Sequence, residues 1–383
     1  MATATHTFLD QIALDANLPS QATQILDASG ARTPETIMSL LASFPSLSRS
    51  GLLDAPRISS AVMQRAGAGV ASMLSVASAA SATTMSPRRA PQAPGYGANA
   101  PNVALFKPQQ VVPLPAAAPP GGVPGIASAA VIPSRTDVRG CLPWPVRDQG
   151  KRGTCVAFGT TALREQLLCE QQAATQDLSE QFLYYDIKTN SSDPRKTSDG
   201  TWIEYAFESL NNAGICPEAT WPYNPAINAT SVSQGPPPQG ASNQAMALQW
   251  TAAVRSYISA KAGNAQVVLN ALASGRPVAV SLPVFSDPTN LQVDNWSTPA
   301  GWLYGVVIDP PPTSIAIGGH CVCVTGFEPD ATEPLGGYFV IRNSWSTNWG
   351  QQLPQPGYHG PEAGYGQISA SYVDAYLWEY GQL

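Results

Sequence analysis

The sequence predicts an α+β protein that is preceded by a small all-α module. Within residues 134–383 helical patterns come first and strand patterns follow, which is typical of an α+β domain with two halves. Hydrophobic residues make up 44% of the 383-residue chain, so a sizeable core can form. Prolines gather in a segment between the two predicted parts, and this segment divides the chain into three units.

The first unit is a helical module over residues 1–82. Thr33-Pro34 predicts a helix start, because threonine caps a helix N-terminus and proline fits its first position. An apolar stripe follows at helical spacing, formed by Ile37, Leu40, Leu41 and Phe44. The module has no nucleophile and no metal-binding cluster, so we interpret it as a pro-region or as a docking unit with a partner.

The second unit, residues 83–133, is predicted to be an extended linker, because eleven of the 48 residues from Ser86 to Pro133 are proline. Residues 1–133 carry a net charge of +2 and residues 134–383 a net charge of −8. This asymmetry permits an alternative, in which residues 86–133 form a strap that docks on the acidic domain after it.

The third unit, residues 134–383, contains both helical patterns and strand patterns. Helices are predicted over 154–171, 200–213 and 265–274. Strands are predicted over 278–282, 321–325 and 338–342, because each is rich in valine and isoleucine or cysteine and is bounded by glycine or proline.

Composition excludes several classes of protein. A net charge of −6 argues against a nucleic-acid binder held by phosphate contacts, and no stretch of about 20 apolar residues predicts a membrane span. Six cysteines are too few for a disulfide scaffold, so most are expected to be buried thiols. No metal or other cofactor is predicted. The N-terminus has no signal-peptide pattern, so we expect a cytoplasmic protein and leave export by another route open.

One segment predicts nucleophilic chemistry. Residues 148–154 form a glycine-containing loop that leads into a helix beginning with Cys155. The positive end of the helix dipole lowers the pKa of a thiol at that position and favours the thiolate. Gln149 lies six residues upstream, and its amide with the Cys155 N–H supplies two donors for a developing oxyanion.

Two further residues complete a catalytic set. His320 immediately precedes a predicted strand and Asn343 follows another. A thiol needs a base that takes its proton, and an imidazole needs an acceptor that fixes its tautomer and ring plane. Taken singly, His320 reads as a core histidine and Asn343 as a turn residue, but the three together favour catalysis.

At these positions the chain resembles the papain-like cysteine peptidases of the C1 family. The similarity lies in Gln149–Phe158 and in Asn343–Gly350, where Ser346 takes a glycine position. Shorter matches are Leu178–Gln181, Trp221–Tyr223 and Gly364–Gly366. The resemblance covers residues 133–383 and implies a helical lobe and a β-barrel-like lobe with a cleft between them. Insertions at 225–243 and 287–312 lengthen the spacing from Cys155 to His320.

The resemblance also implies roles for single residues. Cys155 is the nucleophile, His320 the general base and acid, Asn343 the group that orients His320, and Gln149 an oxyanion donor. Substrate contacts are implied for two groups of residues, which are Asp199, Gly200 and Trp202 in one and Gly319 and Trp345 in the other. Gly200 matches the second residue of a glycine pair whose backbone binds substrate, and Asp199 replaces the first.

The chain departs from the family at Arg152, where a disulfide-forming cysteine is usual, and at Val156, where tryptophan is usual. We expect an endopeptidase acting on peptides or proteins, kept inactive as a zymogen when the strap crosses the cleft. Two alternatives remain. One is a catalytically dead relative that binds peptides, and the other is a peptidase effector or cargo delivered through the 1–82 module.

Overall fold

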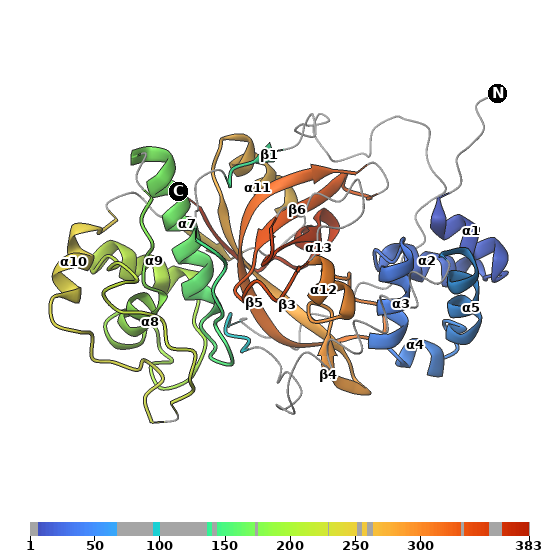
Figure 1. The fold of residues 1–383 in the computed structure, drawn as a ribbon, viewed down its shortest axis with the longest axis horizontal. Coiled ribbons are helices and arrows are strands. Elements are labelled where there is room, and N and C mark those ends of the chain that lie inside the picture. Colours follow the sequence, from blue (N-terminus) through green and yellow to red (C-terminus); the bar gives the residue numbers. More distant parts are fainter. Residues whose placement is uncertain are drawn as a thin grey trace.

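The computed structural model describes residues 7–66, 95–99, 136–139, 144–172, 175–228, 230–250, 255–258, 263–330, 333–351 and 362–382. Figure 1 shows three bodies along the longest axis of the molecule, which are a blue N-terminal helical module, a central orange and red sheet lobe, and a green and yellow helical lobe. The predicted α+β class and the two-lobed arrangement are confirmed.

The N-terminal module has five described helices, α1 (Phe8–Asp15), α2 (Ser20–Ala28), α3 (Pro34–Ser43), α4 (Ser46–Arg49) and α5 (Ala55–Ala66). The helix predicted at Thr33-Pro34 is α3, since the Thr33 side chain accepts the N–H of Thr36 and Pro34 is the first helical residue. The predicted stripe is buried in the module core, except for a half-buried Leu41. Residues 67–82 of the predicted module lie outside the described residues.

This module docks on the sheet lobe. The backbone N–H of Ser46 donates to Asp287 over 2.8 Å, and the Ala300 N–H donates to Ser39 over 3.0 Å. Ile308 of the sheet lobe belongs to the hydrophobic core of the module. The contacts fall in the predicted insertion 287–312, so this inserted segment receives the module.

The helical lobe contains α7 (Cys155–Gln172), α8 (Glu180–Thr189), α9 (Ile203–Asn212) and α10 (Ala241–Ala247). Two predicted helices, 154–171 and 200–213, are therefore α7 and α9, and α9 begins three residues late. The helix over 264–273, α11, was also predicted but packs on the sheet lobe.

The sheet lobe is one antiparallel sheet with the strand order β2-β8-β3-β5-β6-β7, and β1 and β4 pair at its side. The strands are β1 (Thr136–Asp137), β2 (Arg255–Ile258), β3 (Val278–Asp287), β4 (Asn290–Asp294), β5 (Ile315–Pro329), β6 (Gly337–Arg342), β7 (Tyr365–Ser369) and β8 (Glu379–Gln382). Short helices α12 (Pro299–Tyr304) and α13 (Ala370–Tyr376) complete it. The three predicted strands are confirmed within β3, β5 and β6.

Close packing of α7 on β5 joins the two lobes. A Cβ added at Gly159 would lie 2.9 Å from the Cys321 sulfur, so glycine is required for this approach. A shared hydrophobic core contains residues of α7, α8 and α9 together with Ala279, Cys321 and Cys323 of the sheet. The N-terminus of α7 therefore lies beside the part of β5 that carries His320.

Candidate active site

Cys155 is the first residue of α7 and its side chain is fully buried. The backbone amide of Cys321, the residue after His320, lies against the Cys155 sulfur. Helix α7 and strand β5 thus bring the predicted nucleophile and the predicted base to one place.

His320 is held by two neighbours from the segment after β6. Its Nε2 lies 2.7 Å from Oδ1 of Asn343, and the Trp345 ring stacks on the imidazole with centroids 4.6 Å apart. The N–H of Ser344 also donates to Asn343 Oδ1 over 2.8 Å, which fixes this amide. Among the described residues, Nδ1 of His320 has no hydrogen-bond partner, so this nitrogen is the one available to the thiol.

Gln149 is buried beside the same segment. Its backbone N–H donates to the Ser344 carbonyl over 2.8 Å, and the Ser344 hydroxyl donates to Gln149 Oε1 over 2.5 Å. The amide is therefore oriented with Nε2 toward the loop before α7, where Nε2 donates to the carbonyls of Arg152 (2.9 Å) and Gly95 (2.6 Å).

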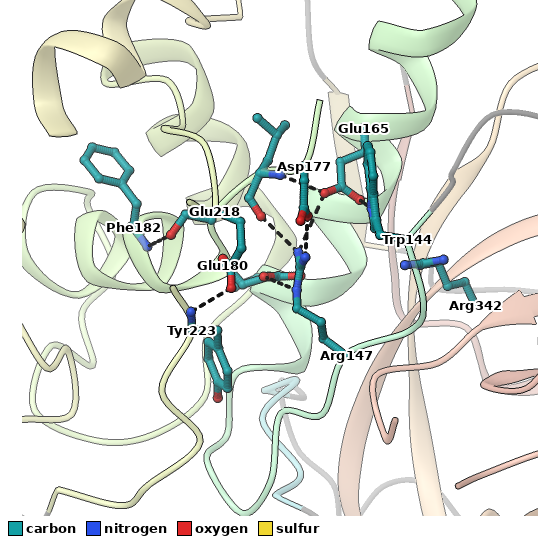
Figure 2. A network of polar contacts seen from close by, with 12 residues as sticks. Trp144, Arg147, Glu165, Asp177, Glu180, Phe182, Glu218, Tyr223 and Arg342 are labelled. Carbon is teal, nitrogen blue, oxygen red and sulfur yellow. Dashed lines mark hydrogen bonds and ion pairs between the residues drawn. The ribbon is translucent and has the colours of Figure 1, made fainter. Parts of the chain in front are cut away.

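Figure 2 shows a polar network around Arg147, two residues before Gln149, that anchors this part of the chain to the helical lobe. The Arg147 guanidinium donates to both carboxylate oxygens of Glu180, to Asp177 and to the Leu178 carbonyl. Glu165 accepts the Leu178 N–H (2.9 Å) and the Trp144 indole N–H (3.1 Å). On the other side the Arg147 carbonyl accepts the Ser346 N–H over 3.0 Å. One short segment therefore links the helical lobe to the segment of Asn343 and Trp345.

Residues 95–99 lie between the two lobes and against the nucleophile. The N–H of Gly97 donates to the Cys155 sulfur over 3.3 Å, and the Ala98 N–H donates to the Gly319 carbonyl over 3.1 Å. A Cβ added at Gly97 would lie 2.0 Å from the Gly153 carbonyl oxygen, so only glycine fits here. We call residues 95–99 the strap segment. The rest of the predicted strap lies outside the described residues.

The strap segment pairs with the backbone of Thr201, the residue after Gly200, for which a substrate contact was predicted. The Thr201 N–H donates to the Gly97 carbonyl (2.8 Å) and the Asn99 N–H donates to the Thr201 carbonyl (2.9 Å). The Gly200 carbonyl accepts instead from the buried ammonium group of Lys188. Thr201, one residue after the glycine of the pattern, therefore offers both its N–H and its carbonyl to the strap segment.

Two other residues that were predicted to contact substrate have partners within the helical lobe. The Asp199 carboxylate accepts the Tyr184 hydroxyl over 3.0 Å, so it faces α8. Trp202 is the N-cap residue of α9, and its ring packs edge-on against Tyr205. Gly319 and Trp345 do contact the strap segment, through the Gly319 carbonyl and through a ring contact of 6.1 Å between Trp345 and Tyr96.

The strap segment covers Cys155 in this structure, which we call the covered form. In this form burial determines the protonation states of Cys155 and His320. Desolvation raises the pKa of Cys155 to about 11 and lowers the pKa of His320 to about 4. The expected lowering of the thiol pKa by the helix start is therefore wrong for the covered form, because desolvation exceeds the effect of the backbone amides. Between these two values the pair is a neutral thiol and a neutral imidazole.

Arg152 stands where the family usually has a disulfide-forming cysteine, and its hydrogen bonds form a polar cross-link at this position. Its buried guanidinium donates to Gln181 (2.8 Å) and to the carbonyls of Asn224 (2.7 Å) and Val232 (3.2 Å). The arginine thus ties the inserted segment near 225–243 to the loop before Cys155. Cys155, Cys216, Cys321 and Cys323 are free buried thiols as expected, whereas Cys169 is disulfide-bonded.

No group of histidine, cysteine, aspartate and glutamate side chains in the described part of the chain is arranged to hold a metal ion. Across the same residues, no helix combines the length and the apolar character needed to cross a membrane. A further histidine of the sequence, His359, falls in residues 352–361, which lie outside the described residues.

Comparison with known proteins gives a consistent result. The model of the papain family of cysteine proteases matches residues 132–360. A cathepsin L-like peptidase of Aedes aegypti is 26% identical over 228 residues, which cover 57% of this chain and 59% of that protein. A cathepsin L-like proteinase of Fasciola hepatica is 26% identical over 232 residues, covering 60% and 62%. The chain thus matches about three fifths of the length of these curated relatives.

Among solved structures, the cysteine protease xylellain from Xylella fastidiosa aligns with 78% of this chain and 98% of its own, at 19% identity and a TM-score of 0.49.

Proposed function

The chain belongs to the papain family of cysteine proteases, and from this premise we propose that it is a cysteine endopeptidase whose strap segment keeps it inactive. The observation that carries the proposal is the set of contacts around Cys155. Asn343 holds the imidazole of His320, the backbone amide of the next residue, Cys321, lies against the Cys155 thiol, and the strap segment donates an N–H to the thiol itself.

In the proposed reaction the Cys155 sulfur attacks the scissile carbonyl carbon, and His320 takes the thiol proton at Nδ1. The carbon–nitrogen bond then breaks, and His320 returns the proton to the leaving amine. Water attacks the resulting thioester while His320 accepts its proton, and cleavage of the carbon–sulfur bond restores the thiol. Asn343 holds the ring through Nε2 over 2.7 Å, so Nδ1 stays directed at the reacting atoms.

Gln149 and the Cys155 N–H are the proposed oxyanion donors. In the covered form the Gln149 amide already donates to a carbonyl of the strap segment, at Gly95. The same donor is suited to the oxygen of a tetrahedral intermediate, because its orientation is fixed by Ser344 before any substrate binds.

The direction of the strap segment explains how it occupies the site without being cut. His320 protonates the leaving amine, so the C-terminal half of a substrate lies on the side of His320 and Trp345. In the strap segment this side holds the N-terminal residue Tyr96, whereas Ala98 and Asn99 lie beside Thr201. The strap segment thus runs in the direction opposite to that of a bound substrate. Its bridge between Ala98 and Thr201 is parallel.

We weigh two alternatives. A catalytically dead binding protein is disfavoured because all four reactive side chains are present and Gln149 and Asn343 are each fixed by hydrogen bonds. An effector or cargo delivered through the N-terminal module remains compatible with an intact site. The expected cytoplasmic location is not part of this proposal, because the disulfide at Cys169 favours an oxidising compartment.

The test compares the full-length chain with Gly97→Val, which places side-chain atoms where the Gly153 carbonyl lies. Labelling of Cys155 by an epoxide-type thiol inhibitor and cleavage of a protein substrate are both measured. We expect both to be faster in the variant, and both to be abolished by an added Cys155→Ala substitution. A labelled but inactive Gly97→Val chain contradicts peptidase activity, and equal labelling of the two chains contradicts inhibition by the strap segment.

A further inference from the structure

The strap segment places one large side chain, Tyr96, in a defined environment on the sheet lobe. Its hydroxyl donates to the Asp294 carboxylate. Its ring packs on Gly318, where an added Cβ would lie 3.1 Å from the Tyr96 Cβ, and on the rings of His320 and Trp345. We call these four residues, Asp294, Gly318, His320 and Trp345, the Tyr96 subsite.

The Tyr96 subsite lies on the leaving-group side of the nucleophile. Gly97, the next residue, contacts the Cys155 sulfur, and the Tyr96 ring lies edge-on to the His320 imidazole, the proposed proton donor to the leaving amine, with ring centroids 6.3 Å apart. The residues of a substrate that follow the cleaved bond therefore reach this subsite once the strap segment has left.

Asp294 is unusual in being a buried carboxylate with neutral partners. It is 2% exposed and lies at the end of β4, within the inserted segment 287–312. Its oxygens accept the N–H groups of Trp296 (2.8 Å) and Ser297 (2.9 Å), the Ser297 hydroxyl (2.7 Å) and the Tyr96 hydroxyl. In the described part of the chain no arginine or lysine pairs with it.

Departure of the strap segment removes one of these donors from a buried acid. A buried charge is stabilised best by a cation with hydrogen-bonding groups, and a phenol hydroxyl is a weaker substitute. The apolar walls of the Tyr96 subsite, chiefly Trp345, also accommodate the aliphatic stem of a long basic side chain.

We propose that the Tyr96 subsite is a specificity subsite of the enzyme, and that Asp294 selects substrates with arginine or lysine, and next tyrosine, among the two residues after the cleaved bond. This inference rests on the proposed function and adds the substrate class to it.

The first experiment uses full-length Gly97→Val and internally quenched peptides with a randomised acyl half. The two residues after the cleaved bond carry arginine, lysine, tyrosine, phenylalanine or leucine. We expect kcat/KM to be about tenfold higher for arginine than for leucine, since a charge-assisted hydrogen bond is stronger than a neutral contact. Asp294→Asn retains acceptors for the two backbone N–H groups and should reduce the arginine-to-leucine ratio to near one.

Asp309→Asn is the matched control. Asp309 is a carboxylate of the same lobe whose partner is the Ser369 hydroxyl (2.7 Å), so this variant should retain the full ratio. Equal cleavage of arginine and leucine peptides, or a ratio unaffected by Asp294→Asn, overturns the inference and leaves the proposed function intact. A Gly97→Val chain that cleaves no peptide contradicts the proposed function and the inference together.

A second experiment needs neither peptidase activity nor a change at Asp294. In the otherwise natural full-length chain, Tyr96→Arg should keep Cys155 as slow to label as the natural chain does, and Tyr96→Leu should label about tenfold faster, since the strap segment then loses its hydrogen bond to a buried charge. Equal labelling of the arginine and leucine variants overturns the inference.

Discussion

The backbone N–H of Gly97 donates to the sulfur of Cys155 over 3.3 Å, so the proposed nucleophile is occupied by a glycine of the same chain. The contact comes from a segment 58 residues upstream and needs no charged side chain. It is one of the contacts that surround the buried Cys155, and burial keeps the thiol and the His320 imidazole neutral. Conversion of this pair to an ion pair moves one proton between the two groups and takes up none from solvent.

Substitution of Gly97 by valine should open the site. Its Cβ would lie 2.0 Å from the Gly153 oxygen, and overpacking of this kind costs roughly 1–3 kcal/mol. The rate of Cys155 labelling should rise about 10- to 100-fold, because each 1.4 kcal/mol is a factor of ten. The double variant with Cys155→Ala reports any labelling at other thiols, and a rate equal to that of the natural chain contradicts closure by the strap segment.

Removal of the Gln149 amide should slow the chemical step. In the opened Gly97→Val chain we expect Gln149→Ala to lower kcat by about 100-fold, the usual effect of losing one oxyanion donor. Ser344→Ala removes only the 2.5 Å bond that orients this amide, so a smaller loss of about tenfold is expected. Steady-state kinetics on one peptide measure both effects. A larger loss for Ser344→Ala than for Gln149→Ala contradicts these assignments.

Arg147→Ala should destabilise the fold strongly. The substitution leaves the Glu180 carboxylate buried without the cation that lies 2.6 Å from it, and removal of one partner from a buried pair costs about 3–5 kcal/mol. The free energy of unfolding in urea measures this cost. Arg49→Ala, at the exposed last turn of α4, is the control and should change stability by less than about 0.5 kcal/mol.

The chain should be more stable at pH 5 than at pH 8. Burial raises the pKa of Glu165 to about 8 and that of Glu379 to about 7. Since both values lie above those of the unfolded chain, the stability from each group is fully present below the unfolded pKa and is lost as the pH rises through the folded one.

Urea midpoints at the two pH values test this expectation. Glu379→Gln should reduce the difference by on the order of 1 kcal/mol or more, because it removes one of the shifted groups. A midpoint that is equal or higher at pH 8 contradicts the burial argument.

The fold and the reactive residues could be predicted from the sequence because both depend on local patterns. Helix α3 follows its Thr33 cap, and the motifs around Cys155 and Asn343 place these residues at the ends of predicted elements. The backbone that pairs with the strap segment is that of Thr201, one residue after the predicted Gly200. A glycine pattern identifies this part of the chain. It does not show which backbone carbonyl is left to pair with another segment, because the Gly200 carbonyl is occupied by Lys188 of another helix.

Docking of the strap was predicted from charge, which does not explain the contacts of the strap segment. Charge asymmetry between the two halves suggested it, yet the described strap segment carries no charge. It is held by backbone hydrogen bonds, by Tyr96 and by a hydrogen bond from Arg195 to the Asn99 side-chain oxygen (2.9 Å). The Asp294 partner of Tyr96 lies in an insertion whose structure no motif predicts. Long-range packing of this kind cannot be deduced from composition.

The strap segment is attached to the folded protein on both sides, and this has a consequence for activation. Upstream it continues to the module docked through Ser46 and Ile308, and downstream it continues to β1. Covalent attachment of this kind makes the return of the strap segment to the site an intramolecular event, with an effective concentration set by the connecting chain. A single cut at residues 67–94 or at 100–135 leaves one tether and therefore a local inhibitor. Full release of the strap segment requires two events, which are either two cuts or one cut together with undocking of the N-terminal module. Activation should therefore occur only when both events have taken place.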